Sequence, residues 1–278
     1  MSTNYPQSTW RLLVTPPLDG ATNMAIDEAI LYALAEQKTQ PTLRFYQWQP
    51  ACLSLGYNQK WVEINQIECA AQGVTWTRRA TGGKAIFHTD ELTYSLITHN
   101  DDPRIEGGIL RSYKALSQAL LQGLKQLGVE VRQAEKRTQP RSKADRKSPV
   151  CFDTPAQYEL IWQGKKLVGS AQLRRKNIVL QHGSLPLHGN LKRILNLLHL
   201  SPEERHRQEQ ILPQRATTLE HATGYIIPFE QVRAALVPSF ATQFNLNFVE
   251  ANLNSAEEAL VEQLRTSQYA NENWNKRV

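Results

Sequence analysis

The chain contains 278 residues, of which 41% are hydrophobic and 21% charged, with a formal net charge of +6. This length and composition allow a sizeable core in one large domain, with or without an appendage, and exclude a chain that is disordered throughout. The N-terminal MSTNYPQSTW has no apolar signal-peptide region, and no apolar run approaches the roughly 20 residues that cross a bilayer, so we expect a soluble, cytoplasmic protein without membrane contact.

The first half of the chain predicts helices and strands in irregular order. Apolar residues at helical spacing, opened by Thr22 or Asn23, predict an amphipathic helix over 22–38. Runs with the composition of strands occur at 42–48, 52–57, 73–79 and 91–98. A strong helical pattern covers 109–128 and ends at Gly128, and a short strand is expected at 129–132.

A basic segment follows at 134–148, AEKRTQPRSKADRKS, in which six basic residues accompany only two acidic ones. Its prolines and its lack of apolar periodicity predict a mobile loop. Because no aromatic residue lies between the charges, stacking on single-stranded nucleic acid is not expected. The segment is either a solvated linker, which we favour, or a docking patch for an acidic protein.

The second half of the chain predicts an antiparallel meander followed by helices. Strands are expected at 157–162, 166–172 and 177–183, with turn-like residues between them. Helices are expected at 191–200 and 229–236, a strand at 246–251, and a last helix with a capping box of Ser255 and Glu258. The whole pattern predicts an α+β fold with mixed, largely antiparallel sheets flanked by helices. We expect one domain over 1–235 and a short helical C-terminal extension over 236–278.

The cysteines are best judged as free thiols. Cys52, Cys69 and Cys151 form neither an even disulfide framework nor a C-x-x-C pair, which is typical of a reducing compartment and argues against a zinc site. Cys151 follows a polar segment and precedes Asp153, whereas core cysteines usually lie within apolar runs. Taken alone, Cys151 is still more typical of a core residue, and Lys166 of an exposed strand end.

The segment RRATGGKAIFH, residues 78–88, combines two arginines, a glycine pair and a histidine between two expected strands. Gly82 and Gly83 allow positive φ and close approach of a ligand to backbone amides. The G-x-x-x-x-G-K-[ST] pattern of a phosphate-binding loop is absent. Judged alone, the glycine pair is more often a plain turn, and His88 more often a structural hydrogen-bonding group.

Several motifs in order resemble the lipoate and biotin protein ligase superfamily. They are NMAIDEA, PTLRFYQW, CLSLGY, RRATGGKAIFHTDELTYSL, CFDTPAQYEL and GKKLVGSAQLRRKNIVLQHGSLPL. The resemblance extends from about Trp10 to about Leu187, recurs more weakly at TTLE and WNKR, and implies a fold like that of the class II aminoacyl-tRNA synthetases and biotin synthetases. It implies that residues 1–235 form the catalytic domain.

Within the superfamily, the chain is most similar to the octanoyltransferases of the LipM type. Ligases usually have a third glycine where Lys84 stands, generally lack a cysteine at position 151, and carry a larger C-terminal domain. ELTYS, Cys151 and the spacing from Cys151 to Lys166 match the transferases instead.

The resemblance implies octanoyl transfer from octanoyl-acyl carrier protein to a lysine of a lipoyl-dependent protein, such as the glycine cleavage H protein. Cys151 would be the nucleophile, through an octanoyl-cysteine thioester, and Lys166 its partner. The substrate-binding residues would be Arg78, Arg79, Thr81, Gly82, Gly83, His88, Gly169 and Ser170. Thioester exchange is nearly balanced and amide formation is downhill, so no cofactor is expected. The acidic partners of such enzymes would account for the basic net charge.

Lowering the pKa of the cysteine cannot be the whole contribution of Lys166. A thiol with a pKa of about 8.5 is several per cent ionised near neutral pH, so full ionisation gains about tenfold, less the accompanying loss of nucleophilicity. We therefore expect Lys166 also to position the acyl carbonyl or relay protons, with amides near Gly82 and Gly83 stabilising the oxyanion.

Three alternatives remain. An ATP-dependent lipoate ligase would need ATP and magnesium and would use Lys166 to contact the activated carboxylate. An amidotransferase would move octanoyl between lipoyl domains with the same cysteine and lysine. A non-catalytic binding protein would have no need of the whole set of residues.

Overall fold

The structure, a computed structural model, describes residues 5–134 and 158–278. Cys151 and the basic segment, apart from Ala134, lie outside the described residues, so their predicted roles stay predictions. No helix within these two ranges is both long and apolar enough to cross a membrane.

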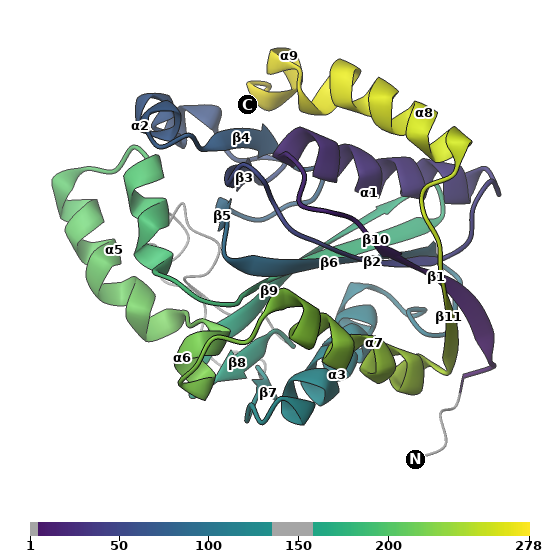
Figure 1. Cartoon of the computed structure of the whole chain (residues 1–278). Coiled ribbons are helices and arrows are strands. Elements are labelled where there is room, and N and C mark those ends of the chain that lie inside the picture. Colours follow the sequence, from purple (N-terminus) through teal and green to yellow (C-terminus); the bar gives the residue numbers. More distant parts are fainter. Residues whose placement is uncertain (1–4, 135–157) are drawn as a thin grey trace.

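The described residues form one large sheet and one small sheet (Figure 1). The large sheet has the strand order β11-β1-β2-β6-β10-β9-β8-β7. β1 pairs in parallel with β11 and β2, and the remaining neighbours are antiparallel. The strands are β1 (Ser8–Val14), β2 (Thr42–Tyr46), β6 (Glu91–His99), β7 (Arg132–Gln133), β8 (Leu160–Trp162), β9 (Lys165–Arg175), β10 (Ile178–Pro186) and β11 (Leu246–Glu250).

The small sheet holds the arginine-glycine segment. Its central strand β3 (Cys52–Leu55) pairs in parallel with β4 (Thr75–Arg78) and antiparallel with β5 (Ile86–His88). Residues 79–85 therefore form the connection between two strands that flank β3, which fixes both ends of that connection. The mixed, largely antiparallel α+β prediction is confirmed.

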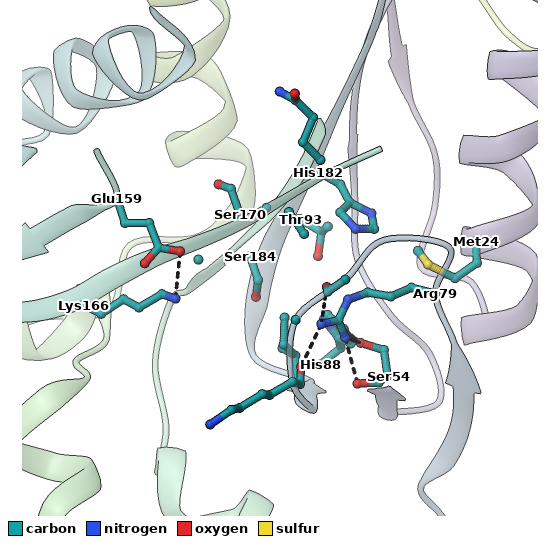
Figure 2. Close-up of a pocket in the computed structure, with 18 of the residues that line it drawn as sticks. Met24, Ser54, Arg79, His88, Thr93, Glu159, Lys166, Ser170, His182 and Ser184 are labelled. Carbon is teal, nitrogen blue, oxygen red and sulfur yellow. Dashed lines mark hydrogen bonds and ion pairs between the residues drawn. The ribbon is translucent and has the colours of Figure 1, made fainter. Parts of the chain in front are cut away.

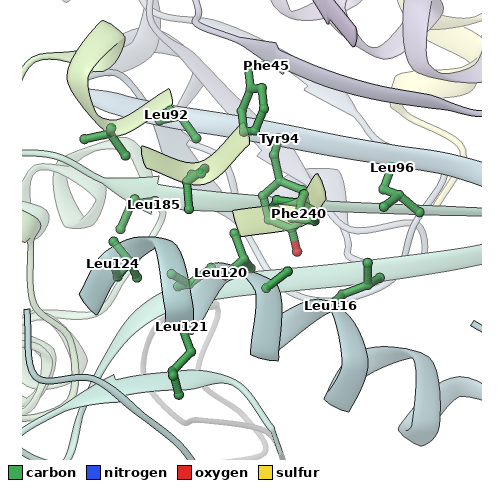
Figure 3. Close-up of a cluster of buried hydrophobic side chains, with 14 of the residues drawn as sticks. Phe45, Leu92, Tyr94, Leu96, Leu116, Leu120, Leu121, Leu124, Leu185 and Phe240 are labelled. Carbon is green, nitrogen blue, oxygen red and sulfur yellow. The ribbon is translucent and has the colours of Figure 1, made fainter. Parts of the chain in front are cut away.

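Two layers of helices cover the large sheet (Figure 1). α1 (Gly20–Ala35) and α8 (Ser255–Leu264) lie on one face, and α3 (Ile109–Gln126) and α7 (Phe229–Phe244) on the other. Successive side chains of a strand point to opposite faces of the sheet, so each strand contributes residues to the hydrophobic core on both faces. Leu12 and Leu96 belong to the α3–α7 core, whereas their neighbours Leu13 and Ile97 belong to the α1 core. Figure 3 shows the first of these, where leucines of α3 meet Phe240 of α7.

Shorter helices surround the small sheet and end the chain. They are the 3₁₀ segments η1 (Trp61–Glu63) and η3 (Leu191–Leu197), the α-helices α2 (Gln66–Ala71), α5 (Pro202–Arg215), α6 (Leu219–Thr223) and α9 (Glu272–Asn275), and a π-helical turn, η4 (Arg265–Tyr269). The helix predicted at 191–200 is therefore a 3₁₀ segment of seven residues. Asn190 caps its first turn by accepting a hydrogen bond from the Lys192 amide.

Two predicted helix starts are wrong by a few residues. Asp19, and not Thr22 or Asn23, caps α1, because its carboxylate accepts from the Thr22 amide at 3.0 Å. The capping box of α8 joins Asn254 and Glu257, one residue earlier than predicted. Both pairs, Ser255 with Glu258 and Asn254 with Glu257, have the spacing of a capping box. Only Glu257 also accepts a hydrogen bond from the guanidinium of Arg11, at 2.6 Å.

The division into residues 1–235 and 236–278 stays a prediction. Helix α7 spans Phe229–Phe244, across that boundary, and β11 beyond it pairs with β1.

Candidate active site

A cavity of about 310 Å³ lies between the two sheets. β9 and β10 of the large sheet form one wall, and β3, β5 and the connection 79–85 form the other (Figure 2). Its aromatic and aliphatic lining includes Met24, Tyr46, Trp48, Ile86 and Tyr113. A cavity of this size, apolar with a few convergent polar groups, is typical of a small-molecule site.

The cavity brings together most of the predicted site residues. Those that line it are Arg79, Gly82, Gly83, His88, Lys166, Gly169 and Ser170. They come from two segments that are far apart in the sequence, 79–88 and 166–170, so the two sheets must pack together before the site exists. Their chemical roles stay predictions.

Arg79 holds the glycine connection in place. Its guanidinium donates to the carbonyl oxygens of Gly82 at 3.0 Å and Lys84 at 2.7 Å, and to the carbonyl of Ser54 at 3.0 Å. Gly83 has φ of +103°, a conformation that disfavours other residues. A Cβ on Gly56 would lie 1.9 Å from the Gly83 carbonyl oxygen, so the connection also needs a glycine opposite it.

Arg78 and Thr81 are not among the described residues that line this cavity. The Arg78 guanidinium donates to the carbonyl oxygens of Gly56, Gln59 and Asn275 at 2.6–2.9 Å. The Thr81 hydroxyl lies 2.7 Å from Nε2 of His182, which does line the cavity. Their predicted part in substrate binding stays a prediction, while their contacts in the structure are with the protein itself.

His88 belongs to a buried hydrogen-bonded chain that reaches the cavity. Its Nδ1 lies 2.7 Å from Oε1 of Glu91, and its Nε2 lies 2.7 Å from the Ser54 hydroxyl. An arginine can only donate, so Ser54 Oγ also accepts a hydrogen bond from Arg79, at 3.0 Å. The indole of Trp48 stacks on the imidazole with centroids 3.9 Å apart. These contacts fix the ring in one orientation.

Glu91 anchors that chain as an anion. Burial would raise the pKa of Glu91, but the charge and hydrogen bond of His88 outweigh it, helped by the hydroxyls of Ser184 and Thr93, so the pKa lies below its usual value. Glu91 therefore accepts hydrogen bonds from three side chains around the cavity.

Lys166 lies on the opposite wall and is buried rather than exposed. Only 2% of its side chain is accessible, and its Nζ lies 2.9 Å from Oε1 of Glu159, which is 4% accessible (Figure 2). Four residues along the strand, Ser170 Oγ lies 2.9 Å from the Tyr94 hydroxyl. Lys166 and Ser170 thus share a face of β9, as the period of two predicts.

Sequence reasoning missed Glu159, His182, Trp48 and Gly183 as lining residues. His182 and Gly183 stand in LQHGS and Trp48 in FYQW, both within segments that carry the resemblance. A Cβ on Gly183 would lie 2.4 Å from Cε1 of Tyr94, so only a glycine fits at this position. A glycine inside a strand often marks a close approach, and Gly183, between the polar residues His182 and Ser184, was therefore the sign in the sequence that these residues line a site. Glu159 stands in CFDTPAQYEL, which also carries the resemblance, but no local pattern indicated its contact with Lys166.

The described residues contain no group of three or more histidine, cysteine, aspartate or glutamate side chains arranged to hold a metal ion.

Comparison with known proteins identifies the family. Octanoyltransferase LipM of Brevibacillus brevis is 40% identical, over 96% of this chain and 99% of that protein. Octanoyltransferase LipM of Clostridioides difficile is 38% identical, over 96% and 98%. The bipartite lipoate protein ligase of Thermoplasma acidophilum shares the fold, with a TM-score of 0.80 at 23% identity over 96% of each chain. Residues 19–241 match the family described as the lipoyl protein ligase A/B catalytic domain, and the chain therefore belongs to that family.

Proposed function

We propose that this enzyme is an octanoyltransferase of protein lipoylation, which moves an octanoyl group onto a lysine of a lipoyl-dependent protein. The observation that carries the proposal is the identity of 38–40% to octanoyltransferases over almost the whole of both chains. The cavity supports it, because its aromatic and aliphatic side chains suit an octanoyl chain and a few polar groups from both walls can bind the acyl oxygen.

The proposed donor is octanoyl-acyl carrier protein. The Cys151 thiolate attacks the thioester carbonyl carbon, a new C–S bond forms, and the carrier thiol leaves. The amine of the target lysine then attacks octanoyl-Cys151, a C–N bond forms, the C–S bond breaks, and the proton released by the amine returns to the cysteine sulfur. Two easier steps replace one difficult transfer. The acyl group is already activated as a thioester, so the proposed reaction uses no ATP, metal or other cofactor.

The described residues have distinct proposed parts in this reaction. Lys166 lines one wall of the cavity, where an ammonium can donate a hydrogen bond to the acyl oxygen. The backbone amides of Gly82 and Gly83 lie in the opposite wall, in the connection that Arg79 fixes. Ser170 lines the cavity from the strand of Lys166, and His88 from the strand that follows the glycine connection. We expect the hydrocarbon chain to lie against Trp48 and Met24.

The proposed acceptor is a lipoyl-domain protein such as the glycine cleavage H protein. Carrier proteins and lipoyl domains of this kind are acidic, so the net charge of +6 would speed their encounter with this chain. A cytoplasmic location stays a prediction.

The direct test is intact-mass analysis after incubation with octanoyl-acyl carrier protein in the absence of ATP. We expect one octanoyl adduct that neutral hydroxylamine removes and that Cys151→Ser does not form. Cys52→Ala and Cys69→Ala are matched controls and should still form it. Burial raises the pKa of Cys52 to about 12 and that of Cys69 to about 11, which leaves almost no thiolate at neutral pH.

Each competing function predicts another outcome of the same experiment. An adduct that persists in Cys151→Ser, or none in the wild-type chain, would contradict the proposal. Strict dependence on ATP with free octanoate or lipoate would indicate a ligase instead. Transfer from octanoyl-H protein, but not from the carrier protein, would indicate an amidotransferase.

A further inference from the structure

Glu159 places a carboxylate directly against the buried Lys166 ammonium, at 2.9 Å, and both residues line the cavity. The buried ion pairs Arg11–Glu257 and Arg44–Asp27, in contrast, do not line it. A buried ion pair is a weak source of stability, because desolvation offsets most of the attraction. Its location in the wall of the proposed active site therefore calls for a functional explanation.

The backbone around the pair is fixed by described residues alone. Glu159 immediately precedes β8, and its carbonyl accepts from the Ala134 amide at 2.7 Å. The Lys166 carbonyl accepts from the Thr217 amide at 3.0 Å. Between β8 and β9 the register shifts at Leu160 and Ile161, a bulge that sets how residues on the two strands face each other. Both side chains thus start from anchored backbone positions.

Glu159 gives the buried Lys166 ammonium a partner of opposite charge. An ammonium with 2% of its surface accessible has lost most of its hydration. A carboxylate in contact offsets part of that loss by charge attraction and restricts the long side chain to one direction. The carboxylate therefore holds the lysine head group at one place in the cavity wall.

We propose that Glu159 is a positioning residue that holds Lys166 as an oriented ammonium toward the acyl group and takes no part in bond making. The inference rests on the proposed function, because Lys166 must act on an acyl thioester for its orientation to matter. The proposed role of Glu159 is exerted through Lys166, so removing Glu159 should have little further effect on the rate of acyl transfer once Lys166 is gone.

The test measures the rate of octanoyl adduct formation against donor concentration for four variants: Glu159→Gln, Glu159→Asp, Lys166→Met and the double variant Lys166→Met/Glu159→Gln. Glu159→Gln keeps the shape and removes the charge, and should lower the maximal rate by at least about tenfold with the donor KM within about twofold. Glu159→Asp keeps the charge and should recover part of that loss. In a Lys166→Met background, adding Glu159→Gln should change the residual rate by less than about twofold.

Glu257→Gln is the matched control. Glu257 is also a buried carboxylate in an ion pair, with Arg11 at 2.5 Å, but it lies on α8 and outside the cavity. It should lower the melting temperature while the rate per folded molecule stays unchanged. If Glu159→Gln does not fold, the rates of Glu159→Asp and of the double variant Lys166→Met/Glu159→Gln, which removes both charges, are compared with wild type instead.

Two results would overturn the inference. One is a folded Glu159→Gln variant with a rate within about twofold of wild type; the other is an equal loss from Glu159→Gln with and without Lys166. Wild-type chain that forms no adduct would instead contradict the proposed function, and the inference with it, so the two failures are distinguishable.

Discussion

Asp27 is the charged centre of a polar cluster behind the cavity. Its carboxylate accepts from Arg44 at 2.8 Å, from the Ser95 hydroxyl at 2.7 Å and from the Tyr46 hydroxyl at 3.0 Å. Burial would raise the pKa of Asp27, but the Arg44 charge and the hydrogen bond from His182 outweigh it and lower the pKa below 3.8. Tyr46 and His182 also line the cavity, so this carboxylate supports the site from outside it.

Asp27→Asn should destabilise the protein by about 3–5 kcal/mol at neutral pH, because it leaves the Arg44 charge buried and unpaired. The effect depends on pH. The pKa of Asp27 is lower in the folded than in the unfolded chain, so its stabilisation is complete above 3.8 and is lost as the pH falls through the folded value. The difference between wild type and variant should therefore shrink on acidification, measured by urea unfolding near pH 6 and about pH 3.

The exposed Asp101→Asn provides the control for that series and should differ little from wild type at either pH. A difference between Asp27→Asn and wild type that stays constant across the range would show that Asp27 is not the titrating group.

At the level of single residues, the sequence predicted which residues belong to the site better than it predicted which side chains contact each other. Arg79, the glycine pair and His88 stand within one contiguous segment, so a pattern could find them. The burial of Lys166 could not be predicted, because it depends on Glu159 across a strand pair with an irregular register.

Helices α3 and α7 approach each other most closely at a glycine. A Cβ on Gly123 would lie 2.7 Å from Cδ2 of Leu236 and 3.1 Å from the Ala235 carbonyl oxygen. The Ser239 hydroxyl donates to the Ala119 carbonyl in the same contact. Gly123 therefore sets the separation of the two helices that cover one face of the sheet.

Gly123→Val should lower the free energy of unfolding by about 1–3 kcal/mol, since the added methyl groups overpack this contact. Gln122→Val is the matched control, because it places the same β-branched side chain on the exposed face of the same helix. Urea denaturation measures both. A loss from Gly123→Val no larger than that from Gln122→Val would show that the contact with α7 does not determine the effect.

Whole elements were predicted with their type right and their ends less certain. The regular patterns of α3 and of the β8–β10 meander predicted both elements, because the apolar period is set by the face each one buries. The prediction of an α-helix at 191–200 was wrong for the same reason, because closely spaced apolar side chains fit a 3₁₀ segment as well as an α-helix. The start of α8 depended on Arg11, which is remote in the sequence.

On the scale of the whole molecule, the C-terminal residues hold the arginine-glycine connection. Oδ1 of Asn275 accepts from the Arg78 amide at 2.8 Å, and the Asn275 carbonyl accepts from the Arg78 guanidinium at 2.7 Å. The Trp274 indole donates to the Arg78 carbonyl at 2.8 Å. The sequence suggested only a weak resemblance at WNKR, because no local pattern reveals a contact across 197 positions.

Asn275→Ala should loosen that connection at a distance from the cavity. It leaves the buried Arg78 amide without its acceptor, at a cost of about 1–3 kcal/mol. We expect faster deuterium uptake in residues 78–84 and slower octanoyl adduct formation. Asn273→Ala, at a neighbouring exposed position, should change neither. Unchanged deuterium uptake in a folded Asn275→Ala variant would mean that the remaining contacts of Arg78 are enough to hold the connection in place.

The same contact has a consequence for biosynthesis. During translation, β3, β4 and β5 leave the ribosome long before residue 275, and β1 is made long before its parallel neighbour β11. Pairings between such distant segments form late, because the chain between them must first be ordered. A nascent chain therefore already carries the arginines and glycines of the site while Arg78 still lacks its acceptors at Asn275, and full acyl-transfer competence should require that residue 275 has been synthesised and has left the ribosome.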